Sequence, residues 1–175
     1  HSDGDTTRLA HVRAMGGLSP RDRDCLLKSV SILIPRNKDA STRLAVYAGG
    51  SLEKGPHTGA PAKLLFDFGP TARGKTGWVT LEHPTGVRIP ANTPVWLAWK
   101  GVGDANVIYF EDEPSRDDFQ PDRGRWDSKA ISLRPDEPWP LVWPAEDTGG
   151  FDAARYCCFL TLEKLQLSRP DPGIN

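Results

Sequence analysis

The chain has 175 residues, 22 basic and 23 acidic, with a formal net charge of −1. This length suits one domain with a substantial core, and the balanced charge lacks the basic excess of a nucleic-acid-binding surface. No apolar run approaches the roughly 18 residues of a membrane span, so we expect a soluble domain that binds neither nucleic acid nor membrane.

Short runs of β-branched and aromatic residues, punctuated by 17 glycines and 16 prolines, follow one another along most of the chain. Such runs are typical of antiparallel strands that are half buried in a sheet. The strands expected in chain order cover 8–14, 27–34, 43–47, 63–68, 78–82, 87–89, 95–100 and 106–111. A short helix is expected to begin at Ser19-Pro20. The turn at 101–104 is expected to join the last two strands as a hairpin.

Residues 111–150 form a segment of different composition, dominated by charges, prolines and tryptophans. Only 129–133 and 141–143 are strand-like within it, whereas 153–166 beyond it is a long regular run that favours a strand. About nine short strands without a long helix predict an all-β fold, a jelly-roll-like antiparallel β-sandwich, with a barrel as the alternative. We assign residues 1–175 to one domain, in which 1–6 are a polar lead-in and 111–150 a loop-rich insertion.

Several short segments of the chain match, in the same order, the core and turn residues of a known kind of module. They are Leu44 to Tyr47, Gly59 to Leu65, Gly77 to Val79, Val87 to Ala91, Trp96 to Ala98 and Arg155-Tyr156. This order resembles the jelly-roll, carbohydrate-binding-type accessory modules of large secreted bacterial proteins. The resemblance implies a lectin-like module without catalytic activity, secreted or at the cell surface, that binds a polysaccharide or glycan beside other domains of a larger protein. The chain opens at His1, which we interpret as a processed or recombinant fragment.

Three tryptophans of the insertion, Trp126, Trp139 and Trp143, are the candidate ligand-binding rings, because flat aromatic rings pack on the apolar faces of sugars. The alternative is a cluster that pins the long loop to the domain. The other three tryptophans lie in strands and are expected in the core. They are Trp78, Trp96 and Trp99, of which the last two, three residues apart, should face opposite sides of the sheet.

Charged neighbours of Trp126 complete the candidate site. Arg125, Asp122 and Asp127 are expected to hydrogen-bond hydroxyl groups or a uronate carboxylate, the arginine in a bidentate manner. The alternative for each of them is a solvated charged loop.

The cysteines and acidic residues do not predict a metal or a cofactor. Cys157 and Cys158 are adjacent, so at most one of them reaches Cys25, and small buried apolar residues are the favoured interpretation over a disulfide. No zinc-ligand spacing occurs. Asp3 and Asp5 are calcium-ligand candidates without an EF-hand loop, and we expect no bound metal.

Two other functions stay open beside glycan binding. One is a structural or adhesive sandwich that contacts protein. The other is a polysaccharide-active enzyme, through the acidic run Glu111-Asp-Glu113 or through copper bound by His1. The second histidine of such a copper site would be one of His11, His57 and His83.

Overall fold

A computed structural model describes residues 10–34, 41–52, 60–102, 109–110, 127–133, 137–144, 149–150, 155–156 and 158–167. Every regular element within these ranges is a β-strand. The strands are β1 (Ala10–Leu18), β2 (Cys25–Ile34), β3 (Ser41–Ala48), β4 (Lys63–Pro70), β5 (Gly77–Ile89), β6 (Pro94–Val102), β7 (Tyr109–Phe110), β8 (Asp127–Leu133), β9 (Gly149–Gly150), β10 (Arg155–Tyr156) and β11 (Cys158–Lys164).

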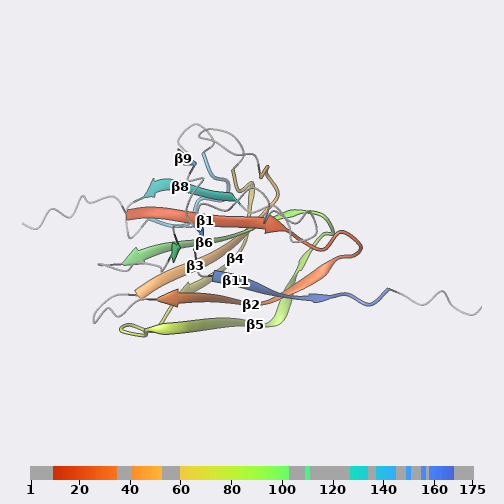
Figure 1. Cartoon of the computed structure of the whole chain (residues 1–175), viewed down its shortest axis with the longest axis horizontal. Helices are drawn as coiled ribbons and strands as arrows, with labels where there is room; N and C mark the ends of the chain where they lie inside the picture. The colour runs from red at the N-terminus through yellow and green to blue at the C-terminus, as the bar shows by residue number, and fades with distance from the viewer. Residues whose placement is uncertain are drawn as a thin grey trace, which may run out of the picture.

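The strands form two main sheets that pack together as layers (Figure 1). The larger sheet has the order β4-β3-β6-β1-β8-β9, and the smaller one has the order β11-β2-β5. Strands β7 and β10 form a separate short pair. All these pairings are antiparallel. The predicted all-β, sandwich-like architecture is therefore confirmed, whereas the jelly-roll connectivity and the number of nine strands stay predictions.

The inner core lies between the two layers and follows from the two-residue period of the strands. Alternate aliphatic side chains of β2, β3, β5 and β6 point into it. Its buried members are Leu27, Val30, Ile32, Ile34, Leu44, Val46, Val79, Ile89, Val95, Leu97 and Trp99. Burying each large aliphatic side chain contributes about 1.5–3 kcal/mol, so this core is the main source of stability that joins the two sheets.

A second core covers the opposite face of the six-stranded sheet. The intervening residues of β3 and β6, Ala45, Tyr47, Trp96 and Ala98, are buried there. Trp139 and Trp143 of the predicted insertion pack onto the same cluster. The central strands β3 and β6 of this sheet are therefore buried on both faces, which explains why 43–48 and 95–99 are nearly continuous apolar runs. Trp96 and Trp99 face opposite sides of the sheet, as predicted.

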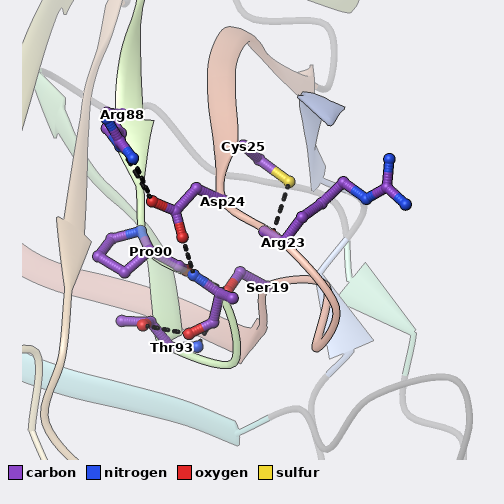
Figure 2. Close-up of polar contacts among 8 residues, drawn as sticks. Ser19, Arg23, Asp24, Cys25, Arg88, Pro90 and Thr93 are labelled. Carbon is purple, nitrogen blue, oxygen red and sulfur yellow. Dashed lines mark hydrogen bonds and ion pairs between the residues drawn. The ribbon is translucent and has the colours of Figure 1, made fainter. Parts of the chain in front are cut away.

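The predicted helix at Ser19-Pro20 is wrong, because Ser19 tethers this connection to the turn between β5 and β6. The Ser19 hydroxyl donates to the Pro90 carbonyl (2.7 Å) and accepts from the Thr93 N–H (2.9 Å). Figure 2 shows these contacts beside those of Asp24, whose carboxylate binds the Arg88 guanidinium at 2.9 Å. Hydrogen bonds to a distant turn replace the cap that the sequence pattern indicated.

Two further predictions of local structure were wrong. The hairpin between 95–100 and 106–111 does not form, because β1 and β3 occupy both edges of β6 and β7 pairs with β10. The strands expected at 78–82 and 87–89 are parts of the single strand β5. Its pairing with β2 passes from Glu82 to Val87 with a shift of register, so the intervening residues bulge out of the ladder.

Candidate ligand-binding face

The strand β5 places an aromatic ring on the side of the three-stranded sheet that points away from the other layer. Val79 and Leu81 point into the inner core. Because successive side chains alternate between the two faces, Trp78, Thr80 and Glu82 lie on the outer face, and all three are exposed.

The strand β11 repeats this arrangement on the other edge of the same sheet. Leu160 and Leu162 pack against the inner core. Phe159, Thr161 and Glu163 are the exposed residues between and beyond them. Each edge strand thus presents an aromatic, a hydroxyl and a carboxylate group on one surface.

The two aromatic rings meet across the central strand β2. Their centroids are 5.3 Å apart and their planes are tilted by 51°, a separation within the range of favourable aromatic pairs. Ser31 lies between them in the sheet, paired with Phe159 on one side and with Thr80 on the other. A larger residue than serine at this position would compete with the rings for space.

Both rings keep about half of their surface in contact with solvent. Trp78 is 55% exposed and Phe159 is 50% exposed. The other two strand tryptophans, Trp96 and Trp99, are buried. Adjacent exposed rings form a contiguous apolar patch, which marks an interaction site, whereas single exposed apolar residues are ordinary. The pair is therefore the main candidate site of the described structure.

Polar groups surround the two rings. The Ser31 and Thr80 hydroxyls are hydrogen-bonded at 2.8 Å, and the Lys28 ammonium lies 3.8 Å from the Glu163 carboxylate. We call the whole surface the aromatic face and define it by the residues Ser31, Trp78, Thr80, Glu82, Phe159, Thr161 and Glu163. It offers apolar ring surface beside hydroxyl donors and carboxylate acceptors, the combination that binds a ligand with both C–H and O–H groups.

The structure places two of the predicted ligand-binding residues in the core of the domain. Trp139 is 6% exposed and Trp143 is 2% exposed. Both make edge-to-face contacts with Tyr47, at centroid distances of 6.4 and 6.0 Å. The Lys100 ammonium lies 5.0 Å from the centre of the Trp139 ring and donates to the Glu137 carbonyl. Buried rings offer no face to a sugar, so the burial favours the alternative interpretation, in which these tryptophans pin the loop.

Hydrogen bonds hold the same loop against the six-stranded sheet. The Tyr47 hydroxyl donates to the Pro140 carbonyl at 2.7 Å, and burial raises the pKa of this hydroxyl well above its usual range. The Leu64 N–H donates to the Leu141 carbonyl, and the Trp143 N–H to the Pro61 carbonyl. The run predicted as a strand at 141–143 is instead an irregular segment bonded at the edge of β4.

Of the remaining predicted site residues, Asp127 is the one that lies in a described strand. Trp126, Arg125 and Asp122 lie outside the described residues, and Asp127 begins β8, where it pairs with Gly16 of β1. The candidate calcium ligands Asp3 and Asp5, the acidic run Glu111-Asp-Glu113, and His1 and His57 also lie outside the described residues.

His83 is the histidine whose side-chain contacts are described. Its Nδ1 accepts the Gly86 N–H at 2.9 Å, and its ring lies 4.3 Å from that of Phe66. These contacts stabilise the bulge of β5 against β4. Across the described ranges, no three His, Cys, Asp or Glu side chains are grouped as a metal site would require. No helix in this part of the chain is long and apolar enough to cross a membrane.

Cys25 is a buried thiol whose Sγ lies 3.8 Å from the Arg23 carbonyl oxygen (Figure 2). In the β2–β11 ladder, Cys25 pairs with Lys164 and Cys158 pairs with Ile32. The length of the strand therefore separates the two thiols, which agrees with the interpretation of Cys25 as a small buried apolar residue rather than half of a bridge with Cys158.

Sequence reasoning missed both rings of the aromatic face. It placed Trp78 in the core, which is wrong, and did not select Phe159. The signal was present in the alternation of each strand. In 78–82 and 159–163 the aromatic residue shares its strand face with threonine and glutamate, and the aliphatic residues occupy the other face.

The fold and the site define a sandwich-like, all-β domain with a paired aromatic surface on its smaller sheet. In comparisons with known proteins, no family model, no curated protein and no solved structure matches this chain. The function is therefore inferred from the chemistry of the aromatic face and from the pattern of the sequence.

Proposed function

We propose that this domain is a non-catalytic carbohydrate-binding module whose aromatic face holds a polysaccharide or glycan. The observation that carries the proposal is the pair of half-exposed rings, Trp78 and Phe159, with centroids 5.3 Å apart. The C–H groups of a sugar ring pack on exposed aromatic surface, and its hydroxyls hydrogen-bond to side chains such as Thr80 and Thr161. Binding of this kind needs no metal or cofactor.

The chemistry of the surroundings favours a glycan over a protein partner at this face. A stable protein interface buries about 800 Å² on each partner around an apolar centre. Here hydroxyl and carboxylate groups border two rings on a narrow three-stranded sheet. A sugar chain, which carries C–H and O–H groups side by side, matches this mixture better than the apolar centre of a protein partner does.

The finer parts of the proposal rest on the sequence resemblance. They are a jelly-roll connectivity of about nine strands, a secreted or cell-surface location, and a place beside other domains of a larger protein. Trp126, Arg125, Asp122 and Asp127 of the insertion are proposed as ligand contacts separate from the aromatic face, because Asp127 begins β8 of the other sheet. Trp139 and Trp143, which belong to the same insertion, are proposed to anchor it on the six-stranded sheet.

A protein-binding module is the second candidate function, and the side chains of Leu141 and Val142 favour it. They are 75% and 61% exposed on the segment that covers the six-stranded sheet. Two adjacent exposed aliphatic residues provide the apolar centre of a small protein contact.

Titration calorimetry, guided by a glycan array, tests the proposed function. We expect Trp78→Ala and Phe159→Ala to weaken glycan binding by about 1–3 kcal/mol each, because each removes an exposed contact ring. The control Leu141→Ala removes an exposed apolar residue outside the aromatic face and should leave the affinity unchanged. A wild-type domain that binds none of a broad set of plant, algal and microbial polysaccharides would contradict the proposal.

A further inference from the structure

Two five-residue segments of the chain share one pattern. Trp78-Val-Thr-Leu-Glu82 and Phe159-Leu-Thr-Leu-Glu163 both have the order aromatic, aliphatic, threonine, leucine, glutamate. They lie on β5 and β11, the two strands that flank β2. Both strands are antiparallel to β2 and therefore run parallel to each other. The aromatic face thus contains the same three outward groups twice, in the same direction.

The register of the sheet fixes how the two sets are displaced. Ser31 pairs with Phe159 and with Thr80, and Ser29 pairs with Thr161 and with Glu82. One set is therefore shifted along the strands by two residues relative to the other, about 7 Å at the usual rise of a β-strand. The two sets of outward groups are thus related by a shift without a change of direction. The units of a linear polymer that follow one another head to tail are related in the same way.

The charges of the face oppose an anionic ligand. Glu82 and Glu163 are exposed carboxylates, and Lys28 is the cation beside Glu163, at 3.8 Å. The other lysine and arginine on the three strands, Lys164 and Arg88, already have acidic partners, Asp22 and Asp24. A uronate or sulfate group on this surface would meet a negative charge without a free basic group to bind it.

We infer that the aromatic face selects an uncharged, linear glycan and holds at least two of its sugar units, one beside Trp78 and one beside Phe159. This inference rests on the proposed glycan-binding function and adds the class of ligand to it. The carboxylates accept hydrogen bonds from sugar hydroxyls and repel polyanionic chains.

Calorimetry with two series of probes tests the inference. The first series is uncharged gluco- and xylo-oligosaccharides of increasing length, and the second is oligouronates and sulfated oligosaccharides of matched length. We expect affinity to rise roughly tenfold or more from one sugar unit to two or three, since linked contacts add their free energies. We expect the anionic series to bind more weakly at low salt.

Charge variants separate electrostatic repulsion from a poor fit. The double variant Glu82→Gln/Glu163→Gln should strengthen binding of the anionic series by roughly two- to fivefold at low ionic strength, and added salt should reduce this gain. The control Asp67→Asn neutralises a carboxylate on β4 of the other sheet and should not change the preference.

Two outcomes would overturn the inference and leave the proposed function standing. They are tighter binding of the anionic series that still depends on Trp78, and equal affinity for a single sugar and for longer chains. Failure of every glycan to bind would instead contradict the proposed function itself.

Discussion

The indole of Trp96 fills the space that a side chain at Gly16 would need. The two residues are paired across β6 and β1, and a Cβ atom placed on Gly16 would lie 2.4 Å from Cε3 of Trp96. The Trp96 Nε1 donates to the Gly49 carbonyl at 2.9 Å, which fixes the ring in this position. The close approach of ring and backbone is therefore a requirement of the second core.

Gly16→Ala should destabilise the domain by about 1–3 kcal/mol, the usual cost of overpacking a well-packed core. Chemical denaturation, monitored by tryptophan fluorescence, measures the change. The double variant Gly16→Ala/Trp96→Leu should cost less than the sum of the two single variants, because the smaller side chain makes room for the methyl group. Strict additivity would show that the close contact is not the cause.

Trp143→Ala should lower the free energy of unfolding by about 3–5 kcal/mol, since it empties a buried aromatic site against Tyr47. Trp78→Ala, its matched counterpart on the aromatic face, should change stability far less because half of that ring is already in solvent. Thermal and urea unfolding of the two variants provide the comparison. Equal losses would contradict the assignment of Trp143 to the core and of Trp78 to the surface.

Tyr47→Phe should destabilise the domain by about 1–2 kcal/mol without changing the fold. The substitution leaves the ring contacts with Trp139 and Trp143 in place but removes the donor to the Pro140 carbonyl. The backbone amide of Leu64 donates to the Leu141 carbonyl of the loop, and the backbone amide of Trp143 in the loop donates to the Pro61 carbonyl. Hydrogen exchange of both amides should become faster. Unchanged exchange would indicate that the hydroxyl does not anchor the loop.

The stability of the domain should fall in acid partly through Asp24. Hydrogen bonds from Arg88 and from the Ala91 N–H lower the pKa of this carboxyl below its ordinary value of 3.8. A group with a lowered pKa in the folded state stabilises that state at neutral pH, and the contribution is lost as the pH falls through the folded-state pKa.

Asp24→Asn should therefore lower the melting temperature at pH 7 and make its decrease between pH 5 and pH 2 less steep than in the wild type, roughly the range over which carboxylates titrate. Arg88→Gln removes the partner and should have the same effect on the slope. Scanning calorimetry across this range measures both variants. A wild-type slope in Asp24→Asn would show that other carboxylates carry the acid sensitivity.

The Cys25 thiol should react slowly with alkylating reagents in the native protein. Burial raises the pKa of this thiol, and the reactive form of cysteine is the thiolate. Mass spectrometry of the Cys25 peptide after timed alkylation measures the rate. Reaction should become fast in urea, whereas fast reaction in native buffer would show that this end of β2 opens readily.

The alternation of residues along each strand determined the all-β fold and most strand positions. In 43–47 and 95–100 nearly every residue is apolar, as in a strand buried on both faces, whereas in 78–82 the apolar and polar residues follow a period of two. Both patterns are local properties that need no knowledge of the partner strand. Because side chains alternate along a strand, the sequence also determined that Trp96 and Trp99 face opposite sides of the sheet. The same alternation places Trp78 on one strand face with the polar residues Thr80 and Glu82, which indicates its outward position.

The tertiary structure decided which faces are covered and which residues meet. Burial of Trp139 and Trp143 depends on a sheet face built from β3 and β6, far away in the sequence. The approach of Trp78 and Phe159 depends on β2 pairing with both edge strands. Strand pairing and the packing of a loop on a sheet are set by contacts between segments that are distant in the sequence. A local pattern therefore gives the strand face on which an aromatic residue lies, but not which residues pack against it.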